Sequence, residues 1–190
     1  MRIITGSAKG AKLEALEGEE TRPTAERVKE AVFSMIQFDI EGRRVLDLFA
    51  GSGQMGLEAL SRGAERAVFT DSNPHAVEII KANAQKIGLF KRCSISCTDY
   101  ARYIRSAAGE KFDIIFLDPP YGSDLLEDAL KMLTAADLVA DNGYVICETD
   151  SPTPLSAEGM RLKRHYKYGR IYISLLTKEA SDDESGDDAE

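Results

Sequence analysis

The alternation of strand-like and helix-like segments between residues 44 and 149 is the feature that most limits how this chain can fold. Short apolar runs typical of buried strands alternate with longer segments in which apolar residues recur at helical spacing. The strand-like runs are 44–49, 66–71, 93–97, 112–118 and 143–149, and the helix-like segments are 56–63, 73–88, 100–108 and 125–136. Strands that alternate with helices form βαβ units, so the pattern predicts a parallel sheet covered by helices.

The final segment breaks this alternation. Residues 160–177 form two consecutive strand-like runs around a turn at Tyr168–Gly169, with no helix between them. They predict an antiparallel hairpin added to the sheet, whereas a dinucleotide-binding domain has an all-parallel sheet of six strands. A seven-stranded, mostly parallel sheet that ends in an antiparallel hairpin is the layout of class I S-adenosylmethionine (SAM) methyltransferases. We therefore predict an α/β protein with this Rossmann-like fold.

Residues 1–40 predict a small N-terminal extension. Strand-like runs at 2–6 and 11–16 flank turn-forming residues, which is typical of a hairpin. An amphipathic helix follows, with Thr24 as its expected cap and apolar residues at 3/4 spacing along one face. The methyltransferase-like domain is then expected to span residues 41–178.

The charge distribution divides the chain further. Of the 32 acidic residues, seven lie in the last twelve positions, which contain no base; the other 25 nearly balance the 24 Lys and Arg. This composition predicts a disordered acidic tail at 179–190. Residues 161–178 contain six Lys and Arg and no acid. That cluster favours a polyanionic partner, and an ordinary solvated sheet face explains it equally well.

Cysteine and histidine content argues against a metal or disulfide framework. Cys93, Cys97 and Cys147 form no C-x-x-C pair, and the chain has two histidines. We interpret the cysteines as buried free thiols and expect no metal site. No run approaches the roughly 18 apolar residues of a membrane span, and the N-terminus lacks the apolar region of a signal peptide. We expect a cytoplasmic protein that acts as a monomer.

A glycine-rich loop follows the first strand of the alternating region. The stretch DLFAGSGQMG, residues 47–56, contains G-x-G-x-x-G, and Asp71 lies twenty positions after Gly51. This spacing matches the dinucleotide fingerprint. The bare backbone would equally admit the amino-acid end of SAM, and Asp71 could accept hydrogen bonds from ribose hydroxyls in either ligand. The glycine spacing alone therefore does not decide between the two cofactors, and Gly56 is better explained by helix–strand packing.

Two carboxylates favour SAM. A buried Asp47 needs a partner, which the SAM amino group supplies and a pyrophosphate does not; the alternative is that Asp47 holds amides of its own loop. Asp99 follows the third strand and can accept from the adenine amine or cap the next helix. The candidate SAM-binding residues are Asp47, Phe49, Gly51, Ser52, Gly53, Asp71, Ser72, Asp99 and Tyr100.

The tetrapeptide DPPY, Asp118 to Tyr121, ends the fourth strand of the alternating region. Ligands of open α/β sheets bind outside the carboxyl ends of the strands, so Asp118 should face the same crevice as the glycine loop. Pro119 and Pro120 fix two φ angles and produce a stiff corner. A purely structural Pro–Pro turn is the alternative.

This corner suits methylation of an exocyclic amine on a nucleobase. The Asp118 carboxylate and the Pro119 carbonyl can accept the two N–H groups of the amine, which turns its lone pair toward the SAM methyl group. Tyr121 can stack on a base that has left its helix. We assign Asp118, Pro119, Pro120 and Tyr121 to the candidate catalytic site, and the sulfonium needs no metal.

The motifs resemble a known family. DLFAGSGQMGLEALSRGA, DPPY and the N-terminal RIITGSAKGAKL and TRPTAERVKEAVFSMI are together similar to the bacterial 16S rRNA (guanine(966)-N2)-methyltransferases of the D type. The resemblance covers Arg2 to about Lys178. It implies a SAM-dependent enzyme that modifies the small-subunit rRNA, either as free 16S RNA or in the assembling small ribosomal subunit. It also implies that the hairpin, with Lys9 beside its turn, contacts RNA and that Arg22, Thr24 and Arg27 border the active site.

Taken only as residues, Arg22 and Arg27 are equally consistent with solvated surface cations. Two features depart from the family. Asp71 occupies a position that is often Glu, and a shorter side chain should weaken SAM binding slightly; the acidic tail is not part of the family pattern.

Three other functions are compatible with parts of the sequence. A DNA amino-methyltransferase acting on adenine N6 or cytosine N4 would use the same chemistry but needs room for a duplex-recognition domain. A nicotinamide-dependent oxidoreductase would need a catalytic His or a Tyr-x-x-x-Lys pair, neither of which is evident. A non-catalytic RNA-binding protein would not need the intact DPPY.

Overall fold

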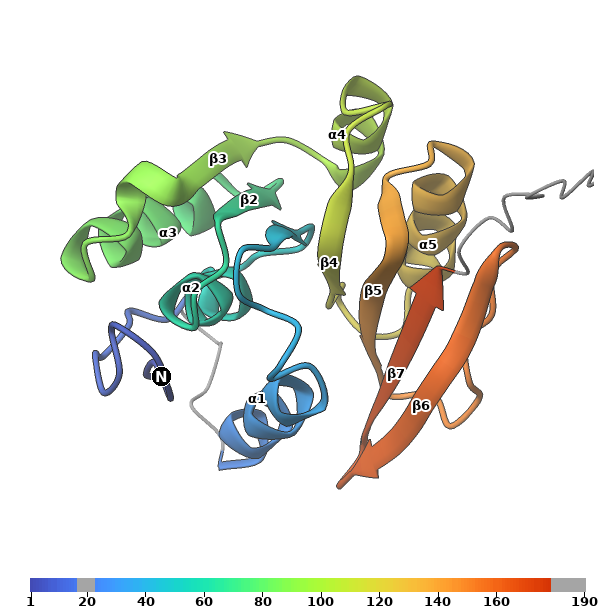
Figure 1. Cartoon of the computed structure of the whole chain (residues 1–190), viewed down its shortest axis with the longest axis horizontal. Helices are drawn as coiled ribbons and strands as arrows, with labels where there is room; N and C mark the ends of the chain where they lie inside the picture. The colour runs from blue at the N-terminus through green and yellow to red at the C-terminus, as the bar shows by residue number, and fades with distance from the viewer. Residues whose placement is uncertain (17–22, 179–190) are drawn as a thin grey trace, which may run out of the picture.

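A seven-stranded mixed sheet forms the centre of the protein (Figure 1). The computed structural model describes residues 1–16 and 23–178, with only the backbone of 23–25. The strands are β1 Arg44–Asp47, β2 Arg66–Asp71, β3 Cys93–Cys97, β4 Phe112–Leu117, β5 Val139–Thr149, β6 Met160–Tyr168 and β7 Ile171–Lys178. The helices are α1 Pro23–Met35, α2 Gln54–Ser61, α3 Pro74–Lys86, α4 Tyr100–Ser106 and α5 Leu125–Ala135, with a 3₁₀ turn at Phe90–Arg92.

The strand order β3-β2-β1-β4-β5-β7-β6 confirms the predicted fold class. Strands β1 to β5 pair in parallel, whereas β7 pairs antiparallel with both β5 and β6. After β3 the chain crosses back to place β4 on the other side of β1. This reversal creates the switch point at which open α/β sheets bind ligands, at the carboxyl ends of β1 and β4.

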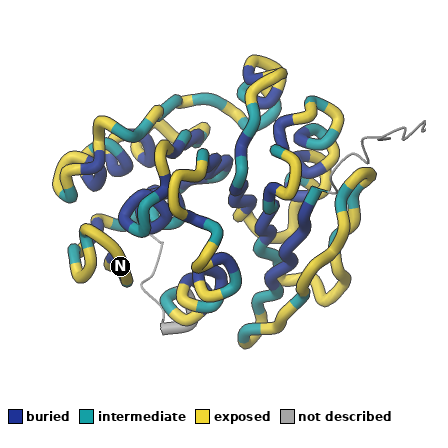
Figure 2. The backbone as a smooth tube through the Cα atoms, in the orientation of Figure 1, coloured by how far each residue is buried: buried dark blue, intermediate teal, exposed yellow. Residues whose placement is uncertain are grey.

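Helices cover both faces of the sheet. Alternate residues of β4 point to opposite sides: Phe116 packs in a core with α1, α2 and α3, and Leu117 packs in a second core with α4 and α5. Figure 2 shows these inner strands buried, and β6, at the edge of the sheet, exposed along most of its length. The period-2 pattern of β4 therefore supplies apolar side chains to two cores at once.

Most predicted boundaries hold, with local differences at two helices and one strand. Asn73 caps α3 by accepting a hydrogen bond from the His75 amide, as predicted. The first helix begins at Pro23, so Thr24 is inside it and is not its cap; proline is favoured at a first helical position. Strand β5 starts before the predicted residue 143, with an irregular register against β4. The glycine-loop helix α2 starts at Gln54, ahead of the predicted residue 56.

Gly56 lies where α2 packs on β2. A Cβ atom at this position would be 2.3 Å from Cε1 of Phe69, closer than any real contact allows. Phe69 is fully buried between the helix and the sheet. The third glycine of the loop is thus required for helix–strand packing, as the sequence predicted.

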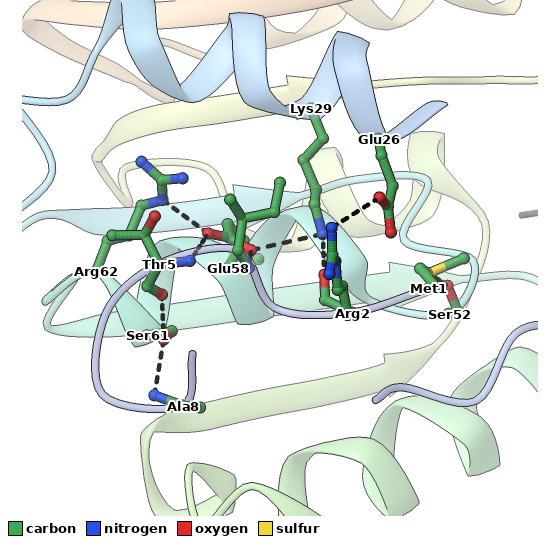
Figure 3. Close-up of polar contacts among 12 residues, drawn as sticks. Met1, Arg2, Thr5, Ala8, Glu26, Lys29, Ser52, Glu58, Ser61 and Arg62 are labelled. Carbon is green, nitrogen blue, oxygen red and sulfur yellow. Dashed lines mark hydrogen bonds and ion pairs between the residues drawn. The ribbon is translucent and has the colours of Figure 1, made fainter. Parts of the chain in front are cut away.

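The predicted N-terminal hairpin is present in short form: Arg2 and Lys12 make one antiparallel bridge, and the Ile3 amide donates to the Ala11 carbonyl across the two arms. Side chains of the main domain also hold residues 1–16 (Figure 3). The Glu58 carboxylate of α2 accepts hydrogen bonds from the amides of Ile4 at 2.7 Å and Thr5 at 3.0 Å. Because these bonds join the extension to α2, both belong to the same folded unit.

A buried ion pair completes this attachment. The ammonium of Lys29 in α1 lies 3.5 Å from Glu58 Oε2 and donates to the Arg2 carbonyl at 2.6 Å. Lys29 is 2% exposed and Glu58 is fully buried; Arg62 Nε also donates to Glu58, at 2.8 Å. Burial lowers the pKa of Lys29, and the attraction of Glu58 opposes that shift. One carboxylate thus connects the N-terminal segment, α1 and α2.

We expect Glu58→Gln to lower the free energy of unfolding by about 3–5 kcal/mol, since it leaves the Lys29 ammonium buried without its carboxylate. Lys29→Met should cost clearly less, because Glu58 keeps Arg62 and the two amides. Urea unfolding of both variants and of the double variant measures the difference. Equal losses in the two single variants would contradict this account.

Candidate active site

A cavity of about 850 Å³ opens at the carboxyl ends of the parallel strands. Its wall includes residues from the glycine loop, from the loops after β2 and β3, and from DPPY. The turn between β6 and β7, the helix α1 and the N-terminal segment complete it. The cavity therefore brings together at one place the two motifs that the sequence analysis singled out.

The glycine loop is held in place by Asp71 at the end of β2. Asp71 Oδ2 accepts from the Gly51 amide at 2.9 Å, and Oδ1 accepts from the Asn73 amide at 2.8 Å. Gly51 and Gly53 both have positive φ, which favours glycine. Asp71, Ser72 and Gly51 line the cavity. Each Asp71 oxygen retains a lone pair that can accept a further hydrogen bond from a ligand.

The Asp47 carboxylate holds a backbone amide of the stretch 47–56, which is the alternative to a contact with SAM. Asp47 is 3% exposed, and its Oδ2 accepts from the Gly56 amide at the start of α2, at 2.9 Å. Asp47, Ser52 and Gly53 are not among the described residues that line the cavity. They support the loop from within the fold, and direct contact of these three residues with SAM stays a prediction.

The loop after β3 supplies a second acidic group and an aromatic pair. Asp99 caps α4 by accepting from the Arg102 amide at 2.9 Å, and it also lines the cavity. The rings of Phe49 and Tyr100 lie 5.4 Å apart at 37° on the cavity wall. Thr98, which the sequence analysis missed, lines the cavity beside them.

All four DPPY residues line the cavity. Asp118 is exposed and Pro119 is buried. The Tyr121 hydroxyl donates to Glu148 Oε1 at 2.6 Å, which ties the ring to the end of β5. Burial raises the pKa of both Tyr121 and Glu148, with their shared hydrogen bond adding to the shift of Tyr121. The tyrosine thus remains a hydroxyl donor with a fixed ring, and Glu148 was not foreseen from sequence.

The extension and the hairpin turn also contribute to the wall. Met1 and Leu16 line the cavity, as do Glu26 and Lys29 of α1 and Arg170 of the turn. None of these five was predicted. Their contribution depends on the tertiary placement of residues 1–16 and of the β6–β7 turn, which no local pattern reveals.

The family resemblance assigned four residues to RNA contact, and the structure describes the side chains of two of them. Lys9 and Arg27 are exposed, and neither lines the cavity. Arg22 and the side chain of Thr24 lie outside the described residues, as does the tail at 179–190. Contact of these four residues with RNA stays a prediction.

The described residues were also compared with the predictions for metal sites, cysteines and membrane spans. Within residues 1–16 and 23–178, no three His, Cys, Asp or Glu gather as a metal site, and no helix is long and apolar enough to span a membrane. The cysteines are free thiols, as predicted, but Cys97 is exposed and Cys93 only half-buried. Both lie in β3 at the sheet edge, where one side remains open.

The sheet order, the closing hairpin and the cavity at the switch point define a class I SAM-dependent methyltransferase fold. The solved structure described as "Putative methyltransferase yhhF from Escherichia coli" superposes with a TM-score of 0.85, at 29% identity over 95% of this chain and 98% of that one. The antiparallel β7 excludes the all-parallel sheet of a nicotinamide-binding domain.

Residues 1–177 match the family described as "Conserved hypothetical protein 95", and the chain belongs to it. "Ribosomal RNA small subunit methyltransferase D" of Escherichia coli K12 is 32% identical over 98% of this chain and 94% of its own length. The Haemophilus influenzae protein of the same name is 34% identical, over 82% and 81%. "Putative rRNA methyltransferase YlbH" of Bacillus subtilis is 37% identical, over 94% and 99%. The resemblance inferred from motifs is confirmed.

The raised pKa of Glu148 predicts a pH effect on stability. A carboxyl group with a raised pKa in the folded state contributes stability below its unfolded value near 4.5, and that contribution is lost as pH rises through the folded value. Glu148→Gln mimics the protonated form and keeps an acceptor for Tyr121, so it should be more stable than the wild type at pH 8 and lose this advantage at pH 4. Thermal unfolding across that range tests it.

The control is Glu158→Gln, which removes an exposed carboxylate outside the cavity. The unfolding temperature of this control variant should follow that of the wild type at every pH. A Glu148→Gln profile parallel to that of the wild type would show that Glu148 ionises normally.

Proposed function

We propose that this protein transfers a methyl group from SAM to the N2 amine of a guanine in 16S ribosomal RNA. The observation that carries the proposal is that Asp118 of DPPY and the loops held by Asp71 and Asp99 line one cavity. The names of its relatives, small subunit methyltransferase D, support rRNA as the substrate. We propose that the protein acts as a monomer, and the substrate implies action in the cytoplasm.

The residues present suit SAM. Asp71 and Asp99 provide carboxylates for ribose hydroxyls and an adenine amine, and Phe49 and Tyr100 provide an aromatic surface beside them. Gly51 presents bare backbone for the amino-acid end. When bound, SAM supplies an electrophilic methyl group on a sulfonium, so these residues need only hold and orient it.

The DPPY corner would hold the acceptor. Asp118 and the Pro119 carbonyl can accept the two N–H bonds of the guanine amine, which aims the nitrogen lone pair into the cavity. Tyr121 is 44% exposed, so one ring face is open to stack on the base, and its bond to Glu148 keeps the ring from turning. The contribution to rate is orientation and electrostatic stabilisation of the positive charge that develops on the amine.

The same geometry would accept the amine of adenine or cytosine. Such a DNA or RNA amino-methyltransferase is therefore the alternative, and the identity of the methylated nucleoside separates it from the guanine-N2 proposal.

Asp71→Asn should reduce SAM affinity about 10- to 100-fold, because it removes charged hydrogen bonds to the ribose and loosens Gly51. Asp113→Asn is a matched control, since Asp113 also accepts from a backbone amide, that of Arg44, but lies outside the cavity. Titration calorimetry with SAM compares the two. Equal affinity in the two variants would remove Asp71 from the cofactor site.

Asp118→Ala should keep SAM affinity within a few-fold and reduce methyl transfer by about 10²- to 10³-fold, because the carboxylate serves the substrate amine. Asp124→Ala, an exposed carboxylate six residues further along, serves as control and should transfer methyl groups normally. Single-turnover rates with saturating SAM provide the measurement. A near wild-type rate for Asp118→Ala would disprove its role.

Methyl mapping of ribosomal RNA tests the function as a whole. RNA from cells that lack this protein should lose one N2-methylguanine in the 16S molecule, and restoring the wild-type gene but not Asp118→Ala should return it. An unchanged 16S methylation map would refute the proposal.

A further inference from the structure

We propose that RNA docks along the outer edge of β6, on a basic track formed by Lys163, Arg164 and Lys167 and continued by Arg170 at the cavity. The proposal rests on the proposed function, because it takes the substrate to be RNA. It adds the surface that holds the RNA while one base enters the cavity.

The track leads from the edge of the sheet to the active site. β6 is the outermost strand in the sheet order, and its outer side pairs with no other strand among the described residues (Figure 1). Tyr172 of β7 pairs with Thr149 at the carboxyl end of β5, so the β6–β7 turn lies at the same edge as the cavity. Gly169 and Arg170 of that turn line the cavity together with Tyr121.

The cations of the track have no described carboxylate at ion-pair distance; Lys163 reaches Asp39 only through the Tyr144 hydroxyl, to which it donates. Lys163, Arg164, Lys167 and Arg170 are exposed, and none forms an ion pair with a carboxylate of the described residues. Two cations at the amino end of β1 are paired instead. Arg43 lies 3.0 Å from Asp113, and Arg44 lies 3.2 Å from Glu110. The absence of acids from 161 to 178 thus leaves a net positive edge on an acidic protein.

Aromatic groups hold these side chains without cancelling their charge. The Lys163 ammonium is 4.9 Å from the centre of the Tyr144 ring, and Lys167 is 5.4 Å from that of Tyr172. Arg164 donates to the Tyr166 hydroxyl at 3.1 Å. Cation–π contacts and neutral acceptors orient a cation but leave it attractive to an anion. The track is therefore ordered before any ligand binds.

Both faces of β6 contribute cations to the track. Arg164 pairs with Leu175, whose side chain packs in the core beneath α1, whereas Lys167 pairs with Tyr172 and so lies on the opposite face. A polyanion that runs along the edge of the strand meets cations from both faces. From Lys163 to Tyr168 the strand spans roughly 17 Å, long enough for several phosphates.

RNA fits this edge better than a folded acidic protein does. Tyr166 is 40% exposed next to Arg164, and an exposed ring between cations provides a stacking surface for an unpaired base. At Arg170 the track ends beside Tyr121, so an RNA strand on the track would reach the ring on which the target base would stack. The phosphate charges of the RNA would hold it on the track, and the cavity would select the base.

The test compares two triple variants that each remove one Arg and two Lys. Lys163→Gln, Arg164→Gln and Lys167→Gln neutralise the track; Arg66→Gln, Lys86→Gln and Lys91→Gln neutralise exposed cations on β2, α3 and the 3₁₀ turn, at the far side of the sheet, which also lack a described carboxylate partner. Binding of transcribed, unmodified 16S rRNA is measured between about 50 and 200 mM salt, together with methyl transfer.

We expect the track variant to reduce the slope of log affinity against log salt by about two and to raise the KM for RNA at least tenfold. Its kcat at saturating RNA and its SAM affinity should stay within about threefold of the wild type, and the control variant should change none of these quantities. Lys167→Glu alone repeats the test with a single exposed change, should the triple variant fold poorly. An unchanged slope and KM, or equal effects of both triple variants, would overturn the proposal.

The two proposals fail separately. If the wild type binds 16S rRNA but transfers no methyl group to it, either free or in small ribosomal subunits, the proposed function fails while the salt slopes still test the track. If the wild type methylates the RNA and the track variant does so with an unchanged KM, only the track is wrong.

Discussion

The carboxylate of Asp71 is the contact on which the active site depends. Its two oxygens hold the amides of Gly51 and Asn73, so the loops after β1 and β2 are fixed relative to each other. This arrangement is possible only because β1 and β2 are parallel neighbours whose carboxyl ends meet at one edge. Since β4 adjoins β1 on its other side, Asp118 reaches the same cavity. The chemistry proposed for DPPY thus depends on a loop geometry fixed some fifty residues earlier in the chain.

A second carboxylate extends this frame to the N-terminus. Glu58 is fully buried and binds the amides of Ile4 and Thr5 as well as two cations. Other groups share this role: Ser61 accepts from the Ala8 amide and Asn83 from the Glu14 amide, and together these contacts hold Met1 and Leu16 at the cavity wall. The extension is therefore part of the site, which gives a physical reason for the family similarity beginning at the first residues.

Sequence patterns predicted the sheet, its hairpin and the meeting of the glycine loop with DPPY, because strand–helix alternation and carboxyl-end geometry follow from local periodicity. They gave both roles of Asp99, as helix cap and as a residue at the cavity, and the packing role of Gly56. They missed Glu148 and Lys29, since a single charged residue in a strand or helix carries no periodic signal for the partner that buries it. The hairpin forms only one bridge, because its two runs are held by α2 as well as by each other. Charge alone did not identify the partner of Asp47, whose buried carboxylate accepts from the Gly56 amide at the start of α2.

The central claim is that one cavity joins a SAM-binding loop to a corner that orients a guanine amine. The most direct measurement is transfer of an isotopically labelled methyl group from SAM to small ribosomal subunits that lack 16S methylation, with nuclease digestion and mass analysis of the nucleosides. This account predicts label in N2-methylguanosine and in no other nucleoside. Label in N6-methyladenosine or N4-methylcytidine, or no label from a protein that binds SAM, would contradict it.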